Sequence, residues 1–231
     1  MSGNRILAAM PAADLALVLP LLETIELPIG AMVQPAGQPA TAVLFVDHGV
    51  TSAIARFDDG KQAEVATIGR EGLLGLVGLN GAEGTPFAVV VQVPGWGRRL
   101  PAARFAALAA CSPTLQDLLA RYAHAQMIQV AQTAACNAVH AVEQRAARWL
   151  LMTQDRMGMG FELTQEYLAA MLGVRRPTVN AIAQTLQESG AIRYTRGAVV
   201  VRDRAMLEQF ACPCYGIVRN AYERAVPGCF T

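Results

Sequence analysis

The sequence predicts an α+β protein in which an antiparallel β domain precedes a long helix and a small helical unit with a β-hairpin. Three observations predict this order. Short apolar runs separated by turn signals fill residues 27–104, and no proline or glycine interrupts the chain between Pro113 and Gly158. Two helical apolar stripes then flank Gly173. Strands that recur every 8–12 residues or so are typical of an antiparallel sandwich or barrel.

The first part of the chain is expected to contain short helices and strands. Residues 11–24 carry leucine and valine at helical spacing, and the alanine-rich residues 101–110 predict a second short helix. Asp59-Gly60 lies between two apolar runs and predicts a hairpin turn. The strands are expected at Ala42–Val46, Val50–Phe57, Gln62–Ile68 and Phe87–Val93.

Composition narrows the class of protein. The chain of 231 residues is 53% hydrophobic and 16% charged, which suits one large or two modest folded domains. Its net charge of +1 does not indicate a particular class of binding partner. Residues 139–231, however, hold 11 arginines against eight carboxylates. Arginine makes bidentate contacts with phosphate and guanine, so the C-terminal part favours a nucleic-acid partner.

A membrane location is not expected. The uncharged residues 27–46 contain three prolines, and residues 122–142 contain several glutamines and two histidines, which are costly in a bilayer. We find no signal-peptide pattern, and five irregularly spaced cysteines do not form a disulfide framework. We therefore expect a soluble, cytoplasmic protein.

A long helical stretch begins at Ser112, because serine is a favoured N-cap and Pro113 a favoured first helical residue. It is expected to divide into helices at 113–136 and 139–157. One stripe with alternating spacing of three and four residues predicts a coiled-coil seam and a homodimer. Packing of this stripe against the chain's own β domain is the alternative. The seam residues are Leu115, Leu119, Tyr122, Gln126, Gln129 and Thr133.

Residues 164–190 form the most informative pattern of the sequence. Thr164 is expected to cap a first helix, Gly173 to supply a tight turn, and Pro177 to lie in the first turn of a second helix. The buried stripe of the second helix is Val179, Ile182 and Leu186. This arrangement predicts a helix-turn-helix, whose second helix enters the major groove of DNA.

The polar face of that second helix carries the expected contacts to double-stranded DNA. Arginine can bind guanine and asparagine can bind adenine, each with two hydrogen bonds. Thr164, at a helix N-terminus, is placed for a phosphate. The following segment resembles a wing, a hairpin that brings Arg193 or Arg196 to the backbone of DNA. An ordinary helical hairpin with solvated arginines is the alternative. The expected DNA-binding residues are Thr164, Arg175, Arg176, Thr178, Asn180 and Arg196.

Nearly the whole chain resembles the CRP/FNR family of bacterial regulators. Gln34–Gly37 resembles the opening of its β-roll, Glu71–Val77 the start of its phosphate-binding cassette, and Glu143–Leu151 the helix leading to the DNA-binding domain. Thr164–Ile192 resembles its helix-turn-helix throughout.

The resemblance implies a three-part organisation. A jelly-roll-like, cyclic-nucleotide-binding-like β-roll would span residues 1–111, a dimerisation helix 112–138 and a winged helix-turn-helix 139–231. It also implies a dimeric transcription regulator, with RNA polymerase as a further candidate partner.

Several positions depart from that family. Arg176 matches a base-reading arginine, and Thr164 and Thr178 match threonines that contact phosphate. Pro177 stands where many members have glutamate, and Ala181 where the members that respond to cyclic AMP have a second arginine. We therefore expect a different target sequence.

The expected effector pocket departs further. Leu73 replaces the glutamate that would hold a ribose hydroxyl, and the expected Arg-Ser pair is absent around Pro86-Phe87. A cyclic phosphate without its arginine lacks its main partner, so cyclic AMP is not expected to bind in the usual way. An apolar ligand, a nucleotide held differently and no ligand are the alternatives, and no resident cofactor is expected. The pocket residues would be Gly72, Leu73, Leu74, Phe87, Gln126 and Val130.

Metal and catalytic sites are not expected. Cys212 and Cys214 supply half of a zinc site, with Cys229 as the nearest helper, whereas zinc usually takes four ligands. His124 and His140 are 16 residues apart and form no pair by spacing. No Walker loop, Gly-x-Ser-x-Gly or His-Glu-x-x-His motif occurs, so we expect no enzyme. The alternative function is a ligand-binding or protein-interaction module that no longer reads DNA.

Overall fold

The computed structural model describes residues 3–58, 60, 62–76, 79 and 84–230. Val77 of the expected cassette and Asp59 of the expected hairpin turn lie outside the described residues.

One antiparallel sheet has the order β1-β6-β3-β4, with β2 paired to β6 and β5 to β3, and a second has the order β7-β9-β8. The strands are β1 (Glu23–Leu27), β2 (Met32–Gln34), β3 (Ala42–Arg56), β4 (Gln62–Ile68), β5 (Leu73–Leu74), β6 (Ala88–Pro101), β7 (Gly160–Glu162), β8 (Ile192–Thr195) and β9 (Ala198–Val201).

The helices follow the predicted order, with differences at their ends. Residues 11–24 divide into a short helix, one 3₁₀ turn and the start of β1. The break between the two long helices lies at His140-Ala141, and the C-terminal helix was not predicted. The helices are α1 (Arg5–Ala9), α2 (Ala12–Val18), η1 (Leu19–Leu21), α3 (Ala102–Ala110), α4 (Pro113–Val139), α5 (Val142–Met157), α6 (Gln165–Leu172), α7 (Arg176–Glu188), α8 (Arg204–Phe210) and α9 (Cys214–Ala225).

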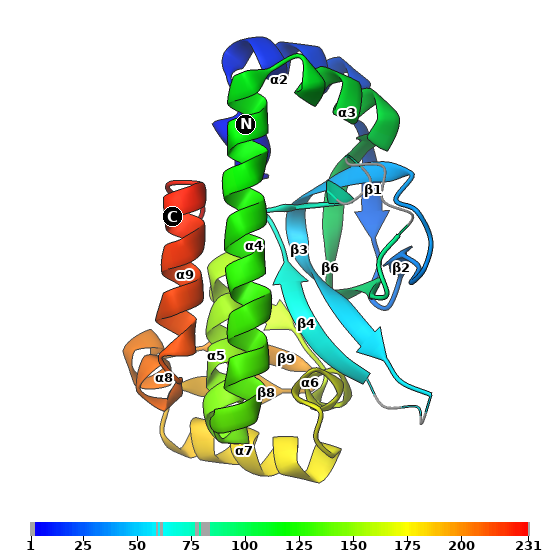
Figure 1. Cartoon of the computed structure of the whole chain (residues 1–231). Coiled ribbons are helices and arrows are strands. Elements are labelled where there is room, and N and C mark those ends of the chain that lie inside the picture. Colours follow the sequence, from blue (N-terminus) through cyan, green and yellow to red (C-terminus); the bar gives the residue numbers. More distant parts are fainter. Residues whose placement is uncertain (1–2, 59, 61, 77–78, 80–83, 231) are drawn as a thin grey trace.

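The long helix α4 runs through the middle of the molecule along most of its length (Figure 1). The β-roll formed by β1 to β6 packs along one side of it, and α9 lies along another side. The helix-turn-helix of α6 and α7 and the hairpin of β8 and β9 lie at the end of the molecule where α4 finishes. The predicted α+β fold class is confirmed. No described helix is both long enough and apolar enough to span a bilayer.

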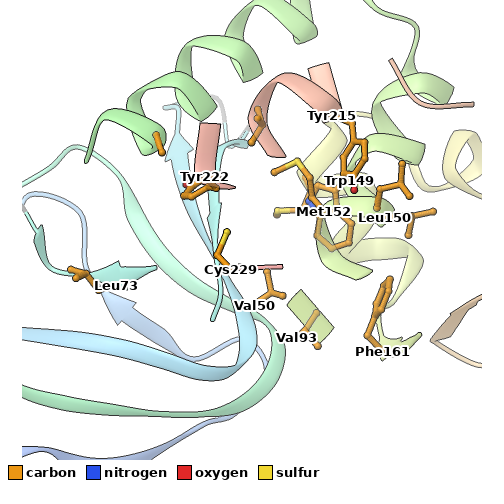
Figure 2. Packing of buried hydrophobic residues seen from close by; sticks show 14 of the residues in the cluster. Val50, Leu73, Val93, Trp149, Leu150, Met152, Phe161, Tyr215, Tyr222 and Cys229 are labelled. Atoms are coloured by element: carbon orange, nitrogen blue, oxygen red, sulfur yellow. The ribbon is translucent and has the colours of Figure 1, made fainter. Parts of the chain in front are cut away.

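One continuous hydrophobic core joins the β-roll to the C-terminal part of the chain. Figure 2 shows Val50 and Val93 of the β-roll near Phe161 of β7, with Trp149 of α5 and Tyr222 of α9 in the same cluster. Because these elements share one core, the two parts are held in a fixed arrangement.

A buried ion pair lies within this junction. Arg156 Nη2 on α5 lies 2.7 Å from Glu71 Oε1 of the β-roll, and the two side chains are 1% and 0% exposed. Arg156 also donates to the Thr67 carbonyl at 3.4 Å and to Gln129 Oε1 of α4 at 3.5 Å. Burial lowers the pKa of Arg156, but the Glu71 carboxylate together with smaller contributions from Tyr222 and Asp155 raises that pKa above its ordinary value.

Two glycines make room for the side chains at this junction. A Cβ atom on Gly69 would lie 2.7 Å from Cδ of Arg156, and one on Gly72 would overlap the hydroxyl of Tyr122. The Tyr122 hydroxyl donates to the Leu73 carbonyl at 3.1 Å and accepts from the Leu73 amide at 3.2 Å. The turn before β5 is therefore shaped by side chains of α4 and α5.

A second polar contact connects β4 to α5. The indole Nε1 of Trp149 donates to Glu64 at 3.1 Å and 3.2 Å, and Ser52 donates to the same carboxylate. Burial raises the pKa of Glu64, although these hydrogen bonds and two nearby arginines oppose the shift. The hydrogen bonds satisfy both oxygens of a carboxylate that has little access to water.

Substitution of Arg156 should lower the free energy of unfolding of the protein. Arg156→Met leaves the Glu71 carboxylate buried without a counter-charge, and Glu71 Oε2 already has no hydrogen-bond partner among the described residues. We expect a loss of about 3–5 kcal/mol in the free energy of unfolding, measured by urea denaturation. The double variant Arg156→Met, Glu71→Leu should recover most of it, because no buried charge is left.

The matched control is Arg99→Leu, which removes the exposed Arg99–Glu23 ion pair, with side chains 49% and 65% exposed. It should cost no more than about 1 kcal/mol. Equal losses for Arg156→Met and Arg99→Leu would contradict a special role for the buried pair.

Candidate nucleic-acid interface and effector pocket

The helix-turn-helix is built as the sequence predicts. The Thr164 hydroxyl accepts from the Tyr167 amide at 3.2 Å and caps α6. Gly173 ends α6 with φ of 66°, a left-handed conformation that glycine adopts without a steric penalty. Val179, Ile182 and Leu186 of α7 are buried, so the opposite face of α7 is directed outward.

That outward face carries the expected polar residues. Arg175 is the N-cap of α7, and Arg175, Arg176 and Asn180 are exposed while Thr178 is partly exposed. Asn180 Oδ1 accepts from Gln165 Nε2 at 3.1 Å, which connects α7 to α6. In Figure 1, α7 lies at the end of the molecule away from the β-roll. The start of α7 therefore presents two arginines and an amide to solvent.

The hairpin of β8 and β9 stands beside this face. Its tip has Arg196 at φ of 50° and Gly197 at φ of 81°, and positive φ angles at both central residues are typical of tight hairpin turns. The Leu163 amide donates to the Gly197 carbonyl at 2.7 Å, and the Tyr194 hydroxyl donates to the Leu163 carbonyl at 2.7 Å. These bonds bring the hairpin tip next to the start of α6 and thus to Thr164.

The first helix of the motif contacts the β-roll directly. The buried Gln92 side chain of β6 donates to the Met171 sulfur of α6 at 3.1 Å. A substituent on Gly30 would lie 2.9 Å from the Tyr167 hydroxyl, so the loop after β1 passes close to α6. The position of the helix-turn-helix is therefore linked to the shape of the β-roll.

A pocket of about 500 Å³ lies between the β-roll and α4. Five of the six expected effector residues line it, namely Leu73, Leu74, Phe87, Gln126 and Val130. Among the described lining residues none is charged, and the polar side chains are Gln34, Thr85 and Gln126. Gly72 is the exception, because it faces Tyr122 instead of the pocket.

The predicted dimer seam needs correction. Leu115, Tyr122 and Gln129 are 0% exposed and Leu119 is 7% exposed within a single chain. Gln129 donates to the Thr67 carbonyl at 2.9 Å, and Thr133 accepts from Arg148. Gln126 lines the pocket beside the β-roll. The stripe Leu115, Leu119, Tyr122, Gln126, Gln129 and Thr133 therefore packs mainly against the chain's own body, which was the alternative interpretation.

A second stripe of α4, displaced by one residue, is directed outward. Met127 is 60% exposed and Val130 is 38% exposed. These two residues also line the pocket. We call the set the α4 outer stripe, and its spacing alternates between three and four residues. It comprises Ala120, Ala123, Met127, Val130 and Ala134.

The cysteines are arranged differently from the expectation. Cys212 and Cys214 form a buried cluster with Cys136 of α4, whereas Cys229 belongs to the main core. His140 joins this cluster, because its Nδ1 lies 3.4 Å from Cys214 Sγ. Sequence reasoning missed Cys136 and His140, although their separation of four residues on a helix was a usable signal.

Comparison with known proteins gives a match for the helix-turn-helix part. Residues 144–210 match the family model of the Crp-like helix-turn-helix domain. A protein of Thermus thermophilus named cyclic AMP receptor protein is 37% identical over 65 residues, which are 27% of this chain. The match spans only 30% of the length of that relative.

Solved structures resemble the whole chain. FixK2 of Bradyrhizobium japonicum has a TM-score of 0.71 at 15% identity, and the match covers 83% of this chain and 98% of that one. A CRP/FNR family transcriptional regulator of Thermus thermophilus has a TM-score of 0.64 at 20% identity, covering 82% and 98%. At such identities the likeness shows the fold, and the match in residues 144–210 adds the sequence relationship. Residues 144–210 of this protein are thus a Crp-like helix-turn-helix domain, and the fold of the whole chain is similar to that of CRP/FNR regulators.

Proposed function

We propose that the protein is a homodimeric transcription regulator that binds double-stranded DNA at a specific sequence. The observation that carries this proposal is the exposed face of α7, where Arg175, Arg176 and Asn180 stand free of the core beside the hairpin tip. These side chains can hydrogen-bond the edges of guanine and adenine in the major groove. Thr164, Thr178 and Arg196 would contact phosphates and set the register of the protein on the duplex.

Dimerisation would bring two such units to one two-fold symmetric site. The α4 outer stripe supports a parallel pairing of two α4 helices, because Met127 and Val130 are left exposed by the single chain. Three of its five members are alanines, so two helices can approach closely. The residues first predicted for this role form the neighbouring stripe of the helix, one position away.

The pocket would bind an uncharged, mostly apolar effector. No described lining residue can neutralise a phosphate, whereas the apolar walls favour burial of a hydrophobic ligand. Met127 and Val130 line the pocket and belong to the α4 outer stripe. A ligand there would touch the dimer-forming face and could change how the two helices pair.

Arg176→Ala should weaken DNA binding by about 1–3 kcal/mol and relax specificity at one base position, because one bidentate base contact is lost. The measurement is fluorescence anisotropy on a duplex selected in vitro with the full-length protein. Arg104→Ala is the matched control, since it removes an exposed arginine of α3 that lies outside the interface. Unchanged affinity and unchanged base preference for Arg176→Ala would refute its role in base reading.

Met127→Arg should shift the protein from dimer to monomer, because two charges would meet at the centre of the proposed seam. Light scattering coupled to gel filtration measures the mass. Phe57→Arg is the control, since Phe57 is similarly exposed at 57% but lies directly after β3, away from α4. A dimer that survives Met127→Arg would mean that another surface joins the subunits.

Cyclic AMP should show no saturable binding in isothermal titration calorimetry with the full-length protein. The reason is the absence of a charged partner for its phosphate among the described pocket residues. Val130→Trp is the control, because its side chain fills the pocket. Any heat that remains with this variant comes from binding outside the pocket. Saturable binding that Val130→Trp abolishes would contradict the assignment of an uncharged effector.

A further inference from the structure

Four side chains of the kind that bind metal ions meet where α4 ends and α9 begins. The sulfur atoms of Cys136, Cys212 and Cys214 and a ring nitrogen of His140 all lie within 4.8 Å of one another. The three thiols are buried and the imidazole is partly buried. This cluster plays no part in the proposed DNA interface or effector pocket.

The local structure explains how four residues separated by up to 78 positions come together. Cys136 lies in the last turn of α4 and His140 is the C-cap four residues on, whose amide donates to the Cys136 carbonyl. This bond keeps the two residues next to each other at the end of the helix. Cys214 is the first residue of α9, and Cys212 lies two positions before it, with Pro213 between them. The corner between α8 and α9 therefore presents two sulfurs to the last turn of α4.

The distances suit one ion at the centre of the four groups. Cys136 Sγ lies 3.4 Å from Cys212 Sγ, and Cys214 Sγ lies 3.4 Å from His140 Nδ1. Ligands about 2.3 Å from a tetrahedral zinc ion stand about 3.8 Å apart, so small shifts complete the geometry. The sulfurs are not bonded to each other, because a disulfide needs a separation of about 2.05 Å.

The chemistry of the four groups selects the metal. Thiolates and imidazole favour zinc over magnesium or calcium, which prefer oxygen ligands. Four protein ligands leave no open position, which is typical of a structural site and not of a catalytic one. Gln132 Nε2 donates to Cys214 Sγ at 3.1 Å and would orient that ligand.

We propose that Cys136, His140, Cys212 and Cys214 bind one Zn²⁺ ion in a structural Cys₃His site. Binding releases the three thiol protons to solvent and changes no oxidation state. The ion would fasten α9 to α4 next to His140-Ala141, the joint between α4 and α5. This inference concerns the assembly of the chain and stands whether or not the protein binds DNA.

Metal analysis of the full-length protein, purified under reducing conditions with zinc and iron both supplied, tests the proposal. We expect about one zinc per chain in the wild type, and loss of most of it in Cys214→Ala and His140→Ala. Cys111→Ala and Cys229→Ala are the matched controls and should keep their zinc, because neither residue belongs to the cluster. A chelator should lower the Tm of the wild type and leave that of Cys214→Ala unchanged.

Cobalt reconstitution keeps the test independent of whether the variants fold. Co²⁺ added to metal-free wild type should give the intense visible absorption of a tetrahedral cobalt–thiolate centre, with one Co²⁺ displaced by one Zn²⁺. Folded wild type that takes up neither metal would overturn the proposal. Iron with acid-labile sulfide, or a Cys136–Cys212 disulfide in the freshly reduced protein, would also overturn it, in favour of a cluster or a redox pair.

Discussion

The Arg156–Glu71 ion pair is the constraint on which the arrangement of the protein depends. Both charges are removed from water, so each needs the other, and the guanidinium also reaches Thr67 of the β-roll and Gln129 of α4. Three parts of the chain therefore meet at one side chain. Since a buried pair broken on one side costs far more than an exposed one, the β-roll, α4 and α5 can move apart only by separating or hydrating this pair.

This junction lies beside the pocket. Glu71 precedes the pocket residue Leu73 by two positions, and Tyr122 of α4 holds the backbone of Leu73 from the other side. A ligand that displaced Leu73 would therefore act on α4 and on the segment that holds Arg156. The pocket also shares Met127 with the α4 outer stripe. The proposed ligand pocket and the proposed dimer face thus both lie close to this group of buried contacts.

The two ends of α4 differ in what surrounds them. Near its start, Leu115 and Leu118 pack into the main apolar core. Near its end, the face toward α9 carries Cys136 in a small core of sulfur atoms. Such a small cluster buries little apolar area, and proteins often stabilise a region without a large hydrophobic core by binding a metal ion. The C-terminal helix already shares the main core through residues such as Tyr222, and the proposed ion would add a second attachment at its first residue.

The sequence by itself determined the local elements. Ser112, Thr164 and Gly173 act through their own backbone neighbours, so the caps and the turn of the helix-turn-helix could be predicted, as could the buried stripe of α7. Which side of α4 faces the chain's own β-roll depends on contacts with distant residues. The predicted stripe and the α4 outer stripe differ by one position, and the larger side chains of the predicted stripe are the covered ones because they fill the core. The meeting of Cys136 with Cys212 was likewise decided only by the tertiary structure, since no local spacing links residues that are 76 positions apart.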